Sequence, residues 1–234
     1  MRKLLPIPKT MSQISSEGFK IIRRIFNPQE IEIMRVEADR ISRGEGSACV
    51  RHLREKSRVF DQLAVSERLL GLLPKGLSPV RSILFDKTPE ENWPVAWHQD
   101  LTITVKEKIE SEGYGPWSTK GGAIHVQPPA TVLSEMMTLR IHLDETSSLN
   151  GALRVIPKSH SKGKISSKDI SAHIDASEFT CECDPGDVLL MSPLILHASK
   201  RSEKPNRRRI IHFEYAPLSS LAKALTWHES SLAK

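Results

Sequence analysis

His98 and Asp100 stand two residues apart in the segment Trp97-His98-Gln99-Asp100. Side chains alternate along an extended backbone, so this spacing places an imidazole and a carboxylate on one side of a strand. A further histidine from a neighbouring strand would complete a facial triad of two histidines and one carboxylate. Such a triad holds Fe(II) on one face of an octahedron and leaves the remaining positions open. His-x-Asp alone is a weak signal, because chance produces it in many chains.

A second His-x-Asp pair occurs at His142 and Asp144, so the two must be compared. Asp144 leads into Glu145-Thr146 and a turn, where it can act as a turn-initiating cap, and His142 then reads as an inward-facing strand residue. The pair at 98–100 follows a segment with proline and tryptophan and precedes a strand. That places it at the rim of a sheet, so we favour it as the metal pair.

The candidate for the third ligand is His197, which ends the apolar run 188–196. Ser199 lies two residues further, on the same strand face, and Arg208 lies eleven residues further, at the start of the next predicted strand. A guanidinium together with a hydroxyl is suited to grip a carboxylate. The spacing therefore predicts a metal site with a carboxylate anchor beside it.

Composition fits one soluble globular domain. The chain has 234 residues, with 38% hydrophobic and 26% charged residues, and this length can bury a substantial core. We expect neither a membrane helix nor a signal peptide, since no apolar run approaches the required length and the basic N-terminus lacks an apolar region. The cysteines Cys49, Cys181 and Cys183 are interpreted as ordinary residues of a cytoplasmic protein.

The net charge of +6 permits attraction to anions,. The basic residues are scattered, however, and the one dense cluster, Arg207–Arg209, runs straight into two isoleucines. With aromatic residues at 5%, stacking platforms are scarce, so we expect no nucleic-acid partner. Alternation turns Arg207 and Arg209 away from Arg208 and predicts that both are exposed.

The pattern of elements predicts a mostly helical N-terminal part (1–77), an all-β core (78–217) and a C-terminal tail (218–234). Asn27-Pro28-Gln29-Glu30 is a helix start with a capping box, and a second helix is expected over 59–73. Strands are expected at 80–85, 101–105, 136–143, 152–156, 188–191 and 209–213, with a hairpin turn at Asn150-Gly151 and another turn at 184–187. The Gly- and Pro-rich connection 113–122 is a candidate lid.

The chain resembles the phytanoyl-CoA dioxygenase family of Fe(II)/2-oxoglutarate-dependent oxygenases. The resemblance is carried, in the family's order, by Gly18-Phe19, by 97–100, by 150–160, and by 185–187 through 197–199 to Arg208. It implies an all-β core with a helical N-terminal elaboration, in a double-stranded β-helix (jelly-roll, cupin-like). It also implies His98, Asp100 and His197 as iron ligands and Arg208 and Ser199 as 2-oxoglutarate ligands. The chain has Pro157-Lys158 where the family often has Pro-Gly, and the partner of the 2-oxoglutarate C1 carboxylate varies within the family.

Five further residues have two interpretations each. Arg140 shares a strand face with His142 and either binds 2-oxoglutarate or an acidic substrate, or forms a structural ion pair. Gln127 either hydrogen-bonds one of these molecules or is a plain loop residue. Trp97 and Trp117 either wall the substrate pocket or pack as ordinary aromatics. Lys87 ends the first core strand and could reach an anionic group, while a solvated lysine is the default.

The resemblance implies an oxygenase that uses O2 and hydroxylates a small molecule with release of succinate and CO2. Asp100 favours hydroxylation, desaturation or cyclisation over halogenation. Two alternatives stay open: a jelly-roll metalloprotein with 2-oxoglutarate-independent chemistry, and a non-catalytic binding protein on the same fold. The basic balance and Arg140 favour an anionic small-molecule substrate, and the sequence names neither that substrate nor the oligomeric state.

Overall fold

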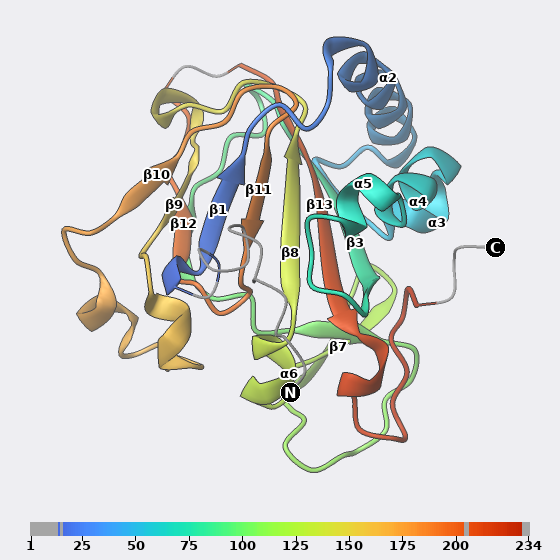
Figure 1. Ribbon diagram of the computed structural model, residues 1–234, viewed down its shortest axis with the longest axis vertical. Helices are drawn as coiled ribbons and strands as arrows, with labels where there is room; N and C mark the ends of the chain where they lie inside the picture. The colour runs from blue at the N-terminus through green and yellow to red at the C-terminus, as the bar shows by residue number, and fades with distance from the viewer. Residues whose placement is uncertain (1–13, 15, 204–205, 231–234) are drawn as a thin grey trace, which may run out of the picture.

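The largest element of the structure is a six-stranded antiparallel sheet (Figure 1). The computed structural model describes residues 14, 16–203 and 206–230. In the large sheet the strand order is β1-β11-β8-β13-β3-β2. The strands are β1 (Phe19–Ile22), β11 (Val188–Met191), β8 (Met137–His142), β13 (Arg208–Pro217), β3 (Leu77–Lys87) and β2 (Cys49–Arg51).

A four-stranded sheet faces the inner side of the large one, and both contribute side chains to a shared interior. Its order is β10-β9-β12-β4, formed by β10 (Phe179–Cys181), β9 (Leu153–Val155), β12 (His197–Ser199) and β4 (Val95–His98). A third sheet of order β5-β7-β6 lies at one end, formed by β5 (Ile103–Val105), β7 (Ala123–Val126) and β6 (Trp117–Lys120). The two facing sheets make the expected double-stranded β-helix.

Helices gather on the outer side of the large sheet, beside β3 (Figure 1). They are α2 (Pro28–Glu45), α3 (Leu53–Lys56), α4 (Arg58–Ala64) and α5 (Glu67–Leu70), while α6 (Ala130–Ser134) lies near β7. Short 3-10 helices occupy Ser148–Asn150, Ser159–Lys162, Ile170–His173 and Leu218–Ser220. The predicted start of α2 is confirmed, because Asn27 and Glu30 form the reciprocal capping box with Pro28 in the first turn,.

Alternation along the strands explains why the large sheet is buried on both faces. Leu84, Ile211 and Phe213 point outward and pack against the helices in the largest apolar cluster. Their neighbours Ile83, Ile210 and His212 point inward and line a cavity between the sheets. Each large aliphatic side chain buried in this way contributes about 1.5–3 kcal/mol to the stability of the fold. The helices therefore shield the outer face of the central strands from water.

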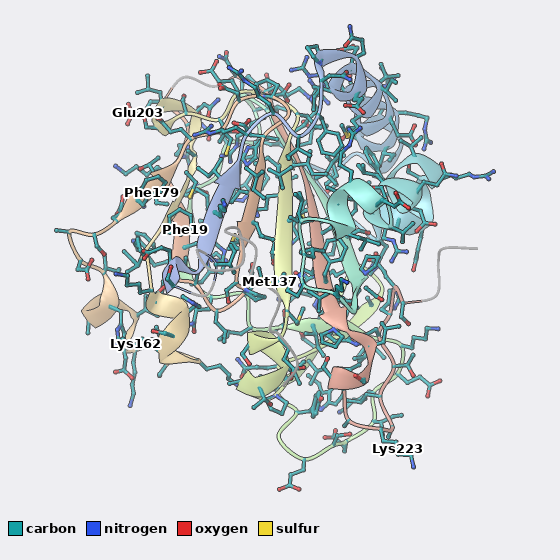
Figure 2. All side chains as sticks on the ribbon, in the orientation of Figure 1. Phe19, Met137, Lys162, Phe179, Glu203 and Lys223 are labelled. Carbon is teal, nitrogen blue, oxygen red and sulfur yellow. The ribbon has the colours of Figure 1, made fainter. Side chains whose placement is uncertain are left out.

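One end of the space between the sheets is filled by apolar side chains. Val155, Cys181, Leu189 and Met191 meet there. At the sheet margins Phe19 of β1 and Phe179 of β10 lie with ring centroids 5.1 Å apart (Figure 2). The cavity occupies the remaining space. All three cysteines are free, and Cys181 and Cys183 are core residues.

Three expectations were wrong in detail. The second helix breaks into α4 and α5, because the Ser66 hydroxyl accepts from Leu69 N and starts a new helix. Asn150-Gly151 does not make a hairpin, since β8 and β9 belong to different sheets. Arg209 is buried rather than exposed, because α2 covers the outer face and its guanidinium binds Asp39 and Asp144.

Arg207 is half-buried on the same side and binds Asp86 and Asp39. The outward-facing arginines on either side of Arg208 therefore attach β13 to its surroundings. Among the described residues, no helix combines the length and the apolar character that a membrane crossing requires.

The turn before β11 tests the fold. Gly186 has a φ of +94°, and a Cβ there would lie 2.4 Å from Phe26 O. We expect Gly186→Ala to lower the free energy of unfolding by about 1–3 kcal/mol beyond the left-handed penalty, through overlap with backbone that cannot move away. Gly76→Ala is the matched control, since Gly76 has a φ of +88° with nothing within 4 Å. Urea unfolding of both variants checks this, and equal losses would contradict it.

Candidate functional site

The site begins with one register of strand pairing. β4 and β12 are antiparallel neighbours in the four-stranded sheet, and His98 lies directly opposite His197. Residues paired across two strands project their side chains on the same face, and here that face lines the cavity. The two imidazole centroids are 4.2 Å apart. The sheet thus brings together two histidines that are about a hundred residues apart in the sequence.

Asp100 joins the two histidines from the end of β4. Its carboxylate oxygens lie 3.6 Å from His98 Nε2 and 3.6 Å from His197 Nε2. The intervening Gln99 points the other way and holds the turn, because its amide donates to Gly163 O and Leu194 O and accepts from Ile165 N. Asp100 N donates to Pro193 O. One potential ligand atom from each triad residue lies within 4.8 Å of the others.

The tautomers of both histidines fit a metal. His98 Nδ1 lies 2.8 Å from Ala96 O, and His197 Nδ1 lies 3.0 Å from Ile195 O. A backbone carbonyl can only accept, so each Nδ1 carries the proton in the neutral ring and Nε2 presents a lone pair. Both Nε2 atoms face Asp100. The residues therefore fit a divalent ion bound by two nitrogens and one carboxylate oxygen, with further positions open.

Charges in the triad support the same arrangement. Burial lowers the pKa of His197 to about 4, which keeps this ring neutral at physiological pH. Burial also acts on Asp100, but the facing His197 and His98 outweigh it and hold the pKa of the carboxyl well below its usual range. Burial opposes protonation of His98 too, yet the Asp100 carboxylate raises its pKa overall. The triad thus offers one fixed negative charge for a cation.

Five basic side chains of the large sheet line the cavity: Arg51, Arg81, Lys87, Arg140 and Arg208. Three of them, Lys87, Arg140 and Arg208, interact electrostatically with one another. Lys87 lies opposite Arg208 in the β3–β13 register. Arg208 Nε and Arg140 Nε are buried without a hydrogen-bond partner, while Arg208 Nη1 donates to Gly151 O. Among the described residues, none of the three cations has a carboxylate within ion-pair distance. Buried cations without counter-ions fit a site that binds an anion.

Mutual repulsion is visible in the pKa values of these cations. Burial lowers the pKa of Lys87 to about 7, and the charges of Arg208 and Arg140 add to the effect. Burial and Arg140 lower the pKa of Arg208 to about 10. Lys87 Nζ donates to Trp93 O at 2.6 Å and lies over the Trp93 ring. The default of a solvated Lys87 was therefore wrong, because the last residue of β3 is buried and its ammonium is covered by Trp93.

Hydrogen bonds along the cavity wall fix the position of Arg140. Its Nη1 lies 3.1 Å from His212 Nδ1, and His212 Nε2 lies 3.2 Å from Glu214 Oε1. Arginine only donates, so His212 accepts at Nδ1 and donates from Nε2. Arg81 Nη1 donates to the same Glu214 oxygen at 3.1 Å. Glu214 is thus occupied by Arg81 and His212, and it leaves Arg140 available to a ligand.

His142 belongs to the cavity although we did not choose it as a metal ligand. It is buried and lines the cavity, as predicted for an inward-facing strand residue. Thr146 Oγ1 donates to Asp144 O and accepts from His142 Nδ1, which leaves Nε2 as an unpartnered acceptor. Asp144 lies outside the cavity and binds Arg209 and Arg35. The two residues of the second His-x-Asp pair therefore face different environments.

The structure does not bring all candidates to the cavity. Its lining includes His98, Asp100, His197, Ser199, Arg140 and Arg208, but not Gln127, Trp97 or Trp117. Trp97 points away from His98 and packs with Ile156 and Leu196 under the Arg154 guanidinium. Trp117 begins β6 of the third sheet and packs against the apolar cluster there. Its indole Nε1 donates to Glu110 Oε2 at 3.2 Å. Gln127 pairs through its backbone with Gly115 and Pro116.

Sequence reasoning missed several residues of the large sheet that line the cavity. They are Cys49, Arg51, Arg81, Ile83, Phe85, Ile210, His212 and Glu214. A signal was present for some of them: Arg208, Ile210, His212 and Glu214 alternate along one strand, so placing Arg208 inward places the others inward as well. The cavity has a volume of about 200 Å³. Its triad and unpaired cations suit an ion together with a small carboxylate-bearing molecule.

Comparison with known proteins bears on the family and on the fold. The family model described as phytanoyl-CoA dioxygenase matches residues 14–210. No curated protein matches the chain. Among solved structures, HygX from Streptomyces hygroscopicus with nickel and 2-oxoglutarate bound has a TM-score of 0.66 at 17% identity, covering 92% of this chain and 88% of that one.

Two further solved structures share the fold. EctD from S. alaskensis with 2-oxoglutarate and 5-hydroxyectoine has a TM-score of 0.70 at 17% identity, with 94% and 79% coverage. The α-ketoglutarate-dependent epimerase SnoN from nogalamycin biosynthesis has a TM-score of 0.68 at 14% identity, with 90% and 82% coverage. At these identities the likeness establishes the fold, and the chemistry has to be argued from the residues of this chain.

The buried Lys87 gives a test of the cavity's electrostatics. Its pKa of about 7 in the folded chain lies below the unfolded value of about 10.4, so between these values the unfolded chain binds more protons and this residue's contribution to stability rises with pH. Relative to Lys87→Met, the wild type should therefore gain up to about 2 kcal/mol in free energy of unfolding between about pH 7 and pH 9. Denaturant unfolding at both pH values measures this, and parallel curves for the two proteins would show that Lys87 reaches solvent.

Proposed function

The chain belongs to the phytanoyl-CoA dioxygenase family, and we propose how its own residues perform Fe(II)- and 2-oxoglutarate-dependent oxygenation of a small molecule. His98, Asp100 and His197 hold the iron, and Arg208 and Ser199 anchor 2-oxoglutarate. The single observation that carries this proposal is the position of the metal triad opposite unpaired buried cations across one cavity. A metal protein without a carboxylate cosubstrate would not need those cations.

Iron(II) in this triad supplies the redox chemistry that couples decarboxylation of 2-oxoglutarate by O2 to oxidation of a substrate. The protein contributes position and polarity. β12, the edge strand β4 and the turn after it would hold the metal with three ligands,, and the Nδ1 hydrogen bonds to Ala96 O and Ile195 O fix both ring planes. Leu153, Val95 and Ile210 line the same cavity and keep water away from the reacting groups.

The cations divide between the two carboxylates of 2-oxoglutarate. Arg140 interacts electrostatically with Asp100 and His197, so it lies on the triad side and suits the carboxylate next to the metal. Arg208 donates to Gly151 O, two residues before Leu153, which pairs with Ser199, so Arg208 and Ser199 together suit the distal carboxylate. Ser199 lies on the same strand as His197 and lines the cavity. A dianion here relieves the repulsion that lowers the pKa values of Lys87 and Arg208.

The substrate is an anionic small molecule, and Arg51 is the residue that favours this class. Arg51 lines the cavity from the edge strand β2, and its Nε is buried without a partner. Arg81 is already paired with Glu214, and the other cavity cations face 2-oxoglutarate. Gly121 packs closely against the Arg51 side chain, since a Cβ at position 121 would lie 3.2 Å from Arg51 Cδ. Arg51 is therefore placed to meet an anionic group beneath the β6–β7 turn.

Replacement of the anchor tests the main proposal. Arg208→Ala should raise the 2-oxoglutarate concentration for half-maximal succinate release by about 10- to 100-fold, since charged hydrogen bonds contribute about 1.5–3 kcal/mol. Anaerobic titration of the Fe(II)-loaded protein, followed through the charge-transfer absorption of the chelate, separates binding from turnover. Arg43→Ala removes the same charge from the last turn of α2 and should change neither value.

Two outcomes would contradict the proposal. Iron-dependent turnover with an unchanged 2-oxoglutarate requirement in Arg208→Ala would indicate chemistry that is independent of this cosubstrate. Tight Fe(II) binding with no succinate release from the wild type, across a broad panel of small molecules, would indicate a binding protein.

The substrate class has its own test. Succinate release by the wild type is measured with a panel of small carboxylic and phosphorylated acids, each beside its neutral amide or alcohol. We expect stimulation by acids, and about a 10-fold or larger rise in the half-maximal concentration of the best acid in Arg51→Met, through loss of one charged hydrogen bond. Basal 2-oxoglutarate binding should stay unchanged in that variant. Stimulation by the neutral partners alone would exclude an anionic substrate.

A further inference from the structure

A second group of potential metal ligands lies outside the cavity. His52, Glu55 and His228 each offer a ligand atom, and these atoms all lie within 4.8 Å of one another. None of the three lines the central cavity. His52 follows β2 and precedes α3, Glu55 lies in α3, and His228 lies in the C-terminal segment that pairs with β5 through Trp227. The cluster thus joins two parts of the chain that are distant in sequence.

His52 carries the argument, because it is buried and neither of its ring nitrogens has a hydrogen-bond partner. The residue is 8% exposed. Its Nδ1 lies 3.3 Å from Glu229 Oε1, but the geometry is not that of a hydrogen bond. The Glu229 carboxylate is held in place by hydrogen bonds from Ser82 N and Ser82 Oγ, and its contact with His52 becomes an ion pair only when the ring is protonated. Buried polar groups are nearly always satisfied, so an imidazole in this state indicates a missing partner.

The other two ligands close the site from the solvent side. His228 Nε2 lies 3.3 Å from Glu55 Oε1, and these side chains are 24% and 41% exposed. The rings of His52 and His228 have centroids 4.5 Å apart and are tilted by 54°. An ion arriving from solvent would thus meet His228 and Glu55 first, with His52 behind them. A water molecule can complete the coordination on the open side.

The backbone of His52 adds an independent observation. His52 adopts a left-handed conformation, with φ of 57° and ψ of 44°, and its side chain does not cap the helix that follows. A residue with a Cβ rarely takes this conformation, and such strain is found where a function requires a particular side-chain direction. Here it coincides with an unpartnered imidazole that belongs to the ligand cluster.

The surrounding charges favour a cation. Glu55 belongs to the cluster and Glu229 lies beside it. Arg54 lies two residues after His52, and its guanidinium binds Asp61 at 2.7 Å and donates to Pro79 O and Glu229 O. Arg54 is therefore neutralised by its own carboxylate. Two imidazoles and a carboxylate are ligands that borderline divalent ions prefer, and Zn²⁺ above all.

We propose that His52, Glu55 and His228 form a second divalent-metal site, suited to Zn²⁺, that is separate from the iron centre. Its role is structural. His228 N donates to Thr104 O, and a metal would fasten this C-terminal segment to α3. The same ion would steady the end of β2, where Arg51 lines the cavity next to His52. This inference does not depend on the proposed oxygenase activity.

Metal stoichiometry tests the proposal on the full chain. The protein is stripped with a chelator, incubated with Zn²⁺ and freed of excess, and its zinc content is measured. We expect about two ions per chain in the wild type, about one in His98→Ala/His197→Ala, about one in His52→Asn/His228→Gln, and none when all four changes are combined. Asparagine is chosen at position 52 because it tolerates the left-handed backbone.

A stability measurement separates loss of metal from loss of fold. In the His98→Ala/His197→Ala protein, Zn²⁺ should raise the melting temperature through the second site alone. Adding Glu55→Gln, a change at a partly exposed side chain, should weaken zinc binding by about 10-fold or more while leaving the metal-free melting temperature unchanged. The control is His173→Ala, in the 3-10 helix Ile170–His173. Introduced alone into the wild-type chain, it should leave two bound ions. A single zinc in the wild type, or two in His52→Asn/His228→Gln, would overturn the proposal.

Discussion

The site depends on the pairing of β4 with β12. This register sets His98 opposite His197, and the turn held by Gln99 brings Asp100 to both rings. A slip of one residue in either strand would turn its histidine to the other face of the sheet, where Trp97 and Leu196 now pack with Ile156. Apolar packing on that back face therefore protects the geometry of the ligands on the front face.

The facing sheet supplies the charge that makes the metal triad part of a larger site. Lys87, Arg140 and Arg208 come from three adjacent strands. Side chains alternate along each strand, so these three point inward while the residues next to them point outward, toward the helices. Arg209 shows the cost of this arrangement, because it must be neutralised by Asp39 and Asp144 on the covered outer face. Burying cations without counter-ions is unfavourable for the empty protein. The binding of a dicarboxylate turns the same feature into affinity.

Part of this site could be predicted from sequence, and the reason lies in the range of the signals. His98, Asp100, His197, Ser199 and Arg208 follow from local spacing and from family resemblance, and all line one cavity. Cys49 and Arg51 could not be found in that way, since no strand was predicted there and their inward direction depends on the pairing of β2 with β3. The Asn150-Gly151 turn misled for a related reason: local turn chemistry does not reveal that the next strand crosses to the other sheet. Arg209 was misjudged because alternation predicts a face, and only packing shows whether that face is covered.

Anaerobic crystallography of the protein with Fe(II) and 2-oxoglutarate, with data collected at the iron absorption edge, tests the central claim most directly. The account predicts one anomalous peak at the cavity within bonding distance of His98, Asp100 and His197, with the distal carboxylate of 2-oxoglutarate against Arg208. Iron bound elsewhere, or bound by the triad with 2-oxoglutarate away from Arg208, would contradict it.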